Sequence, residues 1–133
     1  MALTPFLMFV GQAEEAMDYY VSTFPDAEVL AIDRMPSDPD GGPAVLRSAT
    51  FRIADLTLRC IDSPGVHDFG FTPSVSFFYD CDDVPSFDAI VDRLADGGSV
   101  LMPPAAYPFA HRFAWVNDRF GVSWQLSVAL EAD

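Results

Sequence analysis

The order of expected secondary-structure elements repeats once along the chain, and this repeat constrains the fold more than any other feature. In the first half, a strand-like run, PFLMFV, precedes apolar residues at steps of three and four over residues 12–24, a pattern typical of an amphipathic helix that ends before Pro25. Three more strand-like runs come after this helix: EVLAIDRM, AVLRSATFRI and LTLRCID, the last two joined by a hairpin at Ala54-Asp55. A loop rich in turn formers, PSDPDGGP, separates the first of these three runs from the second.

The second half repeats strand, helix and three strands. SVSFFYD reads as a strand, a helix follows from about Pro85, and Gly97-Gly98 is its stop signal. SVLM, FAWVN and VSWQLSV are the strands after it. Thr-Pro opens both halves, and Asp55 and Asp118 both sit at the turn before the last strand. We therefore predict an α+β fold of two βαβββ units, residues 3–63 and 72–130, within a single domain over 1–133, with residues 65–71 as the joint.

Charge and hydropathy narrow the possible partners. The chain has twenty acidic residues, seven arginines and no lysine. The resulting net charge of -13 repels nucleic acid and anionic membranes. No apolar run approaches the roughly 18–20 residues of a membrane span, and the N-terminus lacks the pattern of a signal peptide. We expect a cytoplasmic protein that binds neither nucleic acid nor membrane.

The sequence offers no clear catalytic group. Cys60 and Cys81 lack a CxxC spacing and are expected to be buried free thiols. Asp62 and Asp80 end strands and are expected to be ordinary solvated acids, and no Ser-His-Asp or Cys-His set lies at usable positions. The chain also has no glycine-rich loop between a strand and a helix for a nucleotide-like cofactor. We expect no cofactor, and the catalytic residues stay unknown.

Alternation of apolar and polar residues assigns the faces of the strands. The apolar set packs under the helices, and in SVSFFYD it comprises Val75, Phe77 and Tyr79. The other set faces a cleft with arginines, hydroxyls, an amide and aromatic rings. Such a lining suits a small organic molecule with an aromatic or apolar body and an anionic or carbonyl head, with Arg59 as its expected anchor. The predicted ligand-binding residues are Arg52, Arg59, Ser74, Ser76, Phe78, Phe113, Trp115 and Gln125.

A duplicated βαβββ chain of this length resembles the vicinal oxygen chelate superfamily, which includes glyoxalases, bleomycin-resistance proteins and extradiol dioxygenases. Within it, the stretches AEEAMDYY and DRFGVSWQL look like the PhnB-like branch, often labelled 3-demethylubiquinone-9 3-methyltransferase-like. The resemblance implies a curved mixed sheet with helices on its outer side, and a homodimer. It does not imply methyl transfer, because the cofactor loop is missing.

Metal-dependent members of the superfamily resemble one another in carrying His, Gln or Glu ligands on the first and last strand of each unit. On this chain those positions fall at Pro5 or Phe6, at Arg59, at Pro73 or Ser74, and at Gln125, so we expect no metal. The alternatives for Gln125 are hydrogen bonds to neighbouring strands or water, contact with a ligand, and ligation of a metal. Three functions stay open: a metal-independent small-molecule binding protein, a glyoxalase-like metal-dependent lyase or dioxygenase, and a dimerisation module without a ligand.

Overall fold

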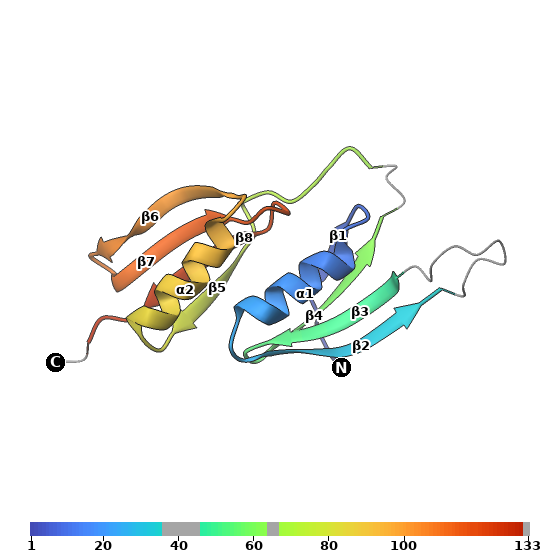
Figure 1. Cartoon of the computed structure of the whole chain (residues 1–133), viewed down its shortest axis with the longest axis horizontal. Coiled ribbons are helices and arrows are strands. Elements are labelled where there is room, and N and C mark those ends of the chain that lie inside the picture. Colours follow the sequence, from blue (N-terminus) through green and yellow to red (C-terminus); the bar gives the residue numbers. More distant parts are fainter. Residues whose placement is uncertain (36–45, 64–66, 132–133) are drawn as a thin grey trace. The chain divides into compact units, whose positions relative to one another are not determined.

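The computed structural model describes residues 1–35, 46–63 and 67–131. They form two compact units, which we call unit 1 (Met1–Asp68) and unit 2 (Phe69–Asp133). Each unit has one helix on a four-stranded mixed sheet (Figure 1). The predicted α+β fold of two βαβββ units is confirmed. In the described part of the chain, no helix combines the length and hydropathy needed to cross a membrane.

In unit 1 the strand order is β1-β4-β3-β2, with β1 parallel to β4 and the other pairs antiparallel. Helix α1 packs on β2, β3 and β4 through the predicted apolar stripe (Figure 1). Tyr20 of α1 and Phe51 of β3 are fully buried and stack with ring centroids 6.2 Å apart. The elements are β1 (Phe6–Phe9), α1 (Ala13–Thr23), β2 (Ala27–Arg34), β3 (Leu46–Ile53) and β4 (Leu56–Asp62).

Unit 2 has the same topology, with strand order β5-β8-β7-β6 and β5 parallel to β8. Helix α2 covers one face of this sheet, and its residues Phe87 and Leu94 are completely buried there. Leu126 of β8 and Val116 of β7 are buried in the same core. The elements are β5 (Ser76–Cys81), α2 (Val84–Ala95), β6 (Ser99–Tyr107), β7 (Ala110–Asn117) and β8 (Ser123–Val128).

The turns before the last strands differ between the units. In unit 1 the predicted hairpin at Ala54-Asp55 is present, with Ala54 at φ 53°. In unit 2 the turn is built around the buried carboxylate of Asp118. Its Oδ1 accepts hydrogen bonds from the backbone N–H groups of Phe120 and Val122 at 2.8 and 3.1 Å, and its Oδ2 accepts one from Trp124 Nε1 at 2.8 Å. Three donors therefore converge on one carboxylate.

At the N-terminus of each helix, an aspartate side chain accepts a hydrogen bond from a backbone N–H group. In unit 1 this aspartate is distant in sequence, and in unit 2 it is the N-cap residue itself. The Asp62 side chain, at the end of β4, accepts a hydrogen bond from the Ala13 N–H at 2.9 Å. Asp83 caps α2 directly by accepting from the Ser86 N–H at 2.8 Å, and this bond lowers the Asp83 pKa. The expectation that Asp62 is an ordinary solvated acid is therefore wrong, since a partner 49 residues away holds it.

Two strand boundaries differ from the prediction. Strand β5 begins at Ser76, and Val75 is 71% exposed because its N–H donates to the Thr72 carbonyl in a turn, so the prediction that Val75 packs is wrong. Strand β6 continues past SVLM and through Pro103-Pro104 as far as Tyr107, with register irregularities. Prolines are tolerated there because β6 is an edge strand. The predicted loop at 36–43 lies outside the described residues.

Candidate ligand-binding site

Each sheet has a face turned away from its own helix, which we call the helix-distal face. In β4 the buried Leu58 and Cys60 lie under α1, and Arg59 between them is exposed on the opposite face. In β8 the buried Trp124 and Leu126 flank Gln125 in the same way. Alternation along the strands thus places Arg59 and Gln125, both predicted to bind the ligand, on the helix-distal faces of their units.

Arg59 lies beside Phe6 in the parallel pairing of β1 with β4. Its guanidinium carbon is 5.4 Å from the centroid of the Phe6 ring, a cation–π arrangement. Four other arginines, Arg34, Arg47, Arg52 and Arg119, are each in an ion pair with a carboxylate. Across the described segments, no ion pair holds Arg59. Its exposed donors are therefore available to an external acceptor.

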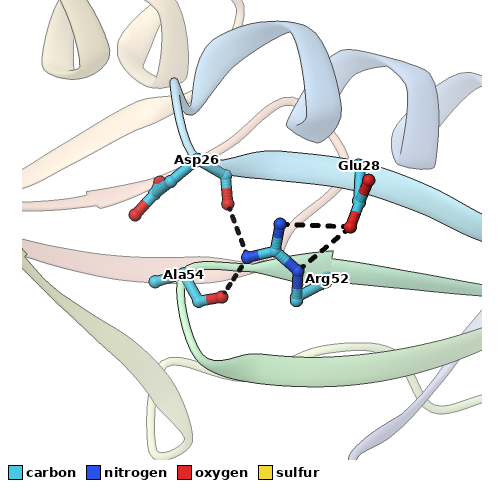
Figure 2. Close-up of polar contacts among 4 residues, drawn as sticks. All are labelled: Asp26, Glu28, Arg52 and Ala54. Atoms are coloured by element: carbon cyan, nitrogen blue, oxygen red, sulfur yellow. Dashed lines mark hydrogen bonds and ion pairs between the residues drawn. The ribbon is translucent and has the colours of Figure 1, made fainter.

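Arg52, also predicted to bind the ligand, has its guanidinium engaged within the protein. Figure 2 shows it at the end of the β2–β3–β4 sheet, between Glu28 of β2 and the turn at Ala54. Nε and Nη2 donate to the Glu28 carboxylate at 3.4 and 3.2 Å. Nη1 donates to the carbonyl oxygens of Asp26, at 3.2 Å, and Ala54. All three nitrogens have partners, so the contacts give Arg52 a structural role.

Three predicted residues share one row across the sheet of unit 2. Phe78 of β5 and Trp115 of β7 both lie opposite Gln125 of β8 in the strand registers. Gln125 Nε2 donates to Ser76 Oγ at 2.8 Å, so Ser76 orients the amide. Trp115 Nε1 donates to Ser123 Oγ at 2.7 Å. Two of the alternatives for Gln125, a bond to a neighbouring strand and contact with a ligand, are therefore compatible. Its nitrogen bonds Ser76 of β5, and its oxygen has no hydrogen-bond partner among the described residues.

Ser74 lies apart from this row. It precedes β5, and its hydroxyl oxygen is 2.6 Å from that of Thr72 within the turn.

Four aromatic rings form a cluster next to this row. Phe113 is only 3% exposed, so it supports the surface and does not form it. Its ring centroid lies 6.2 Å from that of Phe78, 5.7 Å from Tyr107 and 5.0 Å from Phe109. Phe78 and Phe109 are 56% and 58% exposed. Tyr107 and Phe109 were not predicted because the expected strand ended before the two prolines; the alternating aromatics of the run YPFAHRF were the available signal.

The two thiols are free and buried, as predicted. Burial, together with the charge of Asp62, raises the pKa of Cys60 to about 11. Burial and the nearby carboxylates of Asp80, Asp82 and Asp83 raise the pKa of Cys81 to about 12. Because the thiolate is the reactive form, neither thiol is poised as a nucleophile at neutral pH.

Known structures share this architecture. The structure of a putative 3-demethylubiquinone-9 3-methyltransferase, PhnB protein, from Bacillus cereus is 41% identical, covers 97% of this chain and 100% of that chain, and has a TM-score of 0.88. A glyoxylase/bleomycin resistance protein/dioxygenase domain from Frankia sp. EAN1pec is 14% identical, covers 100% of this chain and 95% of that chain, and shares the fold with a TM-score of 0.68. The fold is that of the vicinal oxygen chelate superfamily.

The family within that superfamily follows from the sequence match. A family model described as 3-demethylubiquinone-9 3-methyltransferase matches residues 1–127, and the chain belongs to this family, the PhnB-like branch. Protein YjdN of Escherichia coli is 28% identical over 145 residues, which cover 96% of this chain and 95% of that protein. A D-alanine–D-alanine ligase of Sodalis glossinidius is 32% identical over 108 residues, but the chain spans only 28% of its length.

Metal-dependent members of the superfamily bind a metal at these positions, and the residues present here do not fit one. Phe6 has no donor atom, and the Arg59 guanidinium has no lone pair to offer a cation. Ser74 lies in a turn outside β5, which leaves the single amide oxygen of Gln125, whereas protein metal sites need three or more convergent donors. Within residues 1–35, 46–63 and 67–131, no three His, Cys, Asp or Glu side chains are grouped as a metal site.

Proposed function

We propose that the protein is a metal-independent binder of a small organic molecule that has an aromatic or apolar body and an anionic or carbonyl group. The observation that carries this proposal is the open guanidinium of Arg59 beside the Phe6 ring. In a chain with 20 acids and seven arginines, a solvated arginine has many carboxylates to pair with. An exposed arginine that stacks on a ring, with no described ion pair, suits recognition of a planar anionic group.

The family description names a methyl transfer, which we do not propose for this chain. Both connections from a first strand to a helix lie in the described part, at residues 10–12 and 82–83, and they contain one glycine, Gly11. A nucleotide-like cofactor is usually cradled by several glycines in that loop. A metal-dependent lyase or dioxygenase likewise lacks a donor set among the described side chains.

The test uses benzoate as the probe, titrated into the protein by calorimetry. Arg59→Ala is expected to weaken benzoate binding about 10- to 100-fold, or about 1.5–3 kcal/mol, because it removes a charge-assisted hydrogen bond. Arg59→Lys should recover only part of the loss, since an ammonium lacks the two-pronged geometry. The matched control is Arg47→Ala, another exposed arginine on the same sheet, paired with Asp33 at 3.8 Å. Equal affinity of the parent and Arg59→Ala for benzoate would reject the proposal.

Metal independence is tested separately by elemental analysis of the purified protein. We expect no near-stoichiometric transition metal. A bound metal that is lost on Gln125→Ala would instead support the glyoxalase-like enzyme.

We also propose that the protein forms a homodimer in the cytoplasm, as the resemblance and the composition led us to expect. The edge strand β2 supports self-association, because Val29, Leu30 and Ile32 are 37%, 48% and 41% exposed there. Sedimentation at micromolar concentration should give twice the chain mass of 14.6 kDa, and a single species at 14.6 kDa would contradict the dimer.

A further inference from the structure

The two units place an aromatic ring at the same register position but give it different neighbours. On the helix-distal face of unit 1, the first strand presents Phe6 beside Arg59 of the last strand. In unit 2, the first strand presents Phe78 beside Gln125 of the last strand. The chain's own guanidinium covers the Phe6 ring at 5.4 Å. Phe78 is about as exposed as Phe6, at 56% against 53%, but its neighbour is the neutral Gln125 and not a guanidinium.

We propose that the helix-distal face of unit 2 binds the protonated amine of a small organic molecule, at the place which the Arg59 guanidinium occupies in unit 1. The inference deepens the proposed small-molecule function and rests on it. It assigns an amine as the ligand class for unit 2, separately from the acidic group assigned to Arg59 of unit 1.

Four side chains on this face suit an ammonium group. Phe78 and Trp115 supply two rings on either side of Gln125 in one register row. Because Gln125 Nε2 is engaged with Ser76 Oγ at 2.8 Å, the amide oxygen is left as the acceptor. Asp80, two residues beyond Phe78 on the same face of β5, is an exposed carboxylate. Rings and oxygen acceptors together are the environment that a desolvated ammonium group requires.

The charges of unit 2 favour a cation over an anion at this face. Its three arginines lie elsewhere: Arg93 is on α2, Arg112 stacks on Phe87 of α2 at 5.8 Å, and Arg119 pairs with Asp96 at 3.7 Å. His111, exposed at the start of β7, is the one other basic side chain described in unit 2. A carboxylate bound beside Phe78 would face the amide oxygen, Asp80 and the negative faces of two rings.

The test compares three probes that share a benzyl or phenyl ring: benzylammonium, benzyl alcohol and benzoate. They are titrated at pH 8 and at low salt. The readout is the indole N–H signal of Trp115 in nitrogen-15 spectra, assigned with Trp115→Phe. Trp124, only 2% exposed and bound to Asp118, is the internal reference. Benzylammonium should move the Trp115 signal with an affinity about 5-fold or more above that of benzyl alcohol.

Variants separate the contributions of the acceptor and the ring. Gln125→Glu should raise the benzylammonium affinity about 3- to 10-fold by adding a charge, and Gln125→Leu should lower it by a similar factor. Phe78→Leu should also lower the benzylammonium affinity. Because Phe78 is exposed, this variant provides the test if the Gln125 variants do not fold. Asp92→Asn is the control, since Asp92 is exposed on α2, which covers the opposite face of this sheet. Unchanged benzylammonium affinity in Gln125→Leu or Phe78→Leu would overturn the inference.

The outcomes distinguish this inference from the proposed function. If benzoate shifts the Trp115 signal as strongly as benzylammonium does, the face does not select cations and the inference is wrong. If benzoate binds through Arg59 while benzylammonium does not bind, the inference fails and the proposed function stands. If neither probe binds at millimolar concentration, both fail.

Discussion

Units 1 and 2 share a topology and a strand register, yet their helix-distal faces have opposite hydrogen-bonding character. At the position beside the first-strand phenylalanine, unit 1 carries Arg59, which can only donate, and unit 2 carries Gln125, whose free atom is an acceptor. The repeated topology fixes where the side chain stands, and one residue at that place decides which ligand group it can recognise.

The units also differ in how the turn before the last strand is held, although an aspartate stands there in both. Asp55 is exposed at a tight hairpin, whereas Asp118 is 3% exposed and accepts hydrogen bonds from three donors. The difference lies in loop length. The two-residue hairpin satisfies its backbone through the strand pairing, and the longer turn needs an internal acceptor.

The largest expected effect is on the Asp118 turn. Asp118→Ala should lower the free energy of unfolding by about 3–5 kcal/mol, because it removes the carboxylate that accepts from the buried N–H groups of Val122 and Trp124. The check is urea unfolding followed by tryptophan fluorescence. Asp55→Ala is the matched control in the other unit and should change stability by less than about 0.5 kcal/mol. Equal losses in the two variants would remove this distinction between the units.

The second effect concerns the buried thiols, one in each unit, which should behave alike. Their folded pKa values of about 11 and about 12 lie above an unfolded thiol value of roughly 8.5. A raised pKa means that the folded state holds the proton, so stability is fully present below the unfolded value and is lost as the pH rises toward the folded value. At pH 10 each thiol should cost on the order of 2 kcal/mol relative to pH 7.5.

Urea titrations at the two pH values, on the parent, Cys60→Ala and Cys81→Ala, measure these contributions. Each variant should lose part of the pH dependence, and by a similar amount, because at pH 10 both folded thiols are still protonated. A variant that keeps the full pH dependence of the parent would show that its thiol does not titrate as described.

The smallest effect separates two arginines of unit 1. Arg52→Ala should destabilise the protein by about 1–2 kcal/mol, since Arg52 ties Glu28 and the Asp26 carbonyl to the turn at Ala54 (Figure 2). Arg59→Ala should leave stability within about 0.5 kcal/mol of the parent, because the residue is exposed and its contact is one ring. Thermal and urea unfolding of both variants provide the comparison. A larger loss in Arg59→Ala would indicate a structural role and weaken its assignment as an anchor.

The fold was predictable because its signals are local. The apolar stripes of α1 and α2, the hairpin at Ala54-Asp55 and the stop at Gly97-Gly98 each lie within a few residues of the element they define. The errors arose where tertiary context overrides a local pattern. Val75 fits the alternation of β5 but is drawn into a turn by Thr72, and β6 runs through two prolines because an edge strand tolerates missing donors.

The strand face on which each candidate residue lies was predictable from the sequence, and the contacts of its side chain were not. Alternation alone placed Arg52, Arg59 and Gln125 on one side of their strands. It could not show that Arg52 meets a carbonyl of the turn and Glu28 of β2, because that depends on register between strands. The aromatic cluster around Phe113 was hidden for a similar reason, since β6 brings Tyr107 to it only through an irregular pairing.

The most direct test exchanges the two residues that distinguish the units. Arg59→Gln and Gln125→Arg are each titrated with benzoate and benzylammonium, with the indole signal of Trp115 as the readout for unit 2. Gln125→Arg should cover Phe78 as Arg59 covers Phe6, and so lower the benzylammonium affinity about 10-fold or more. Arg59→Gln should lose benzoate binding while the Trp115 response to benzylammonium stays at the parent level. Benzylammonium binding to Gln125→Arg with the affinity of the parent would contradict the account.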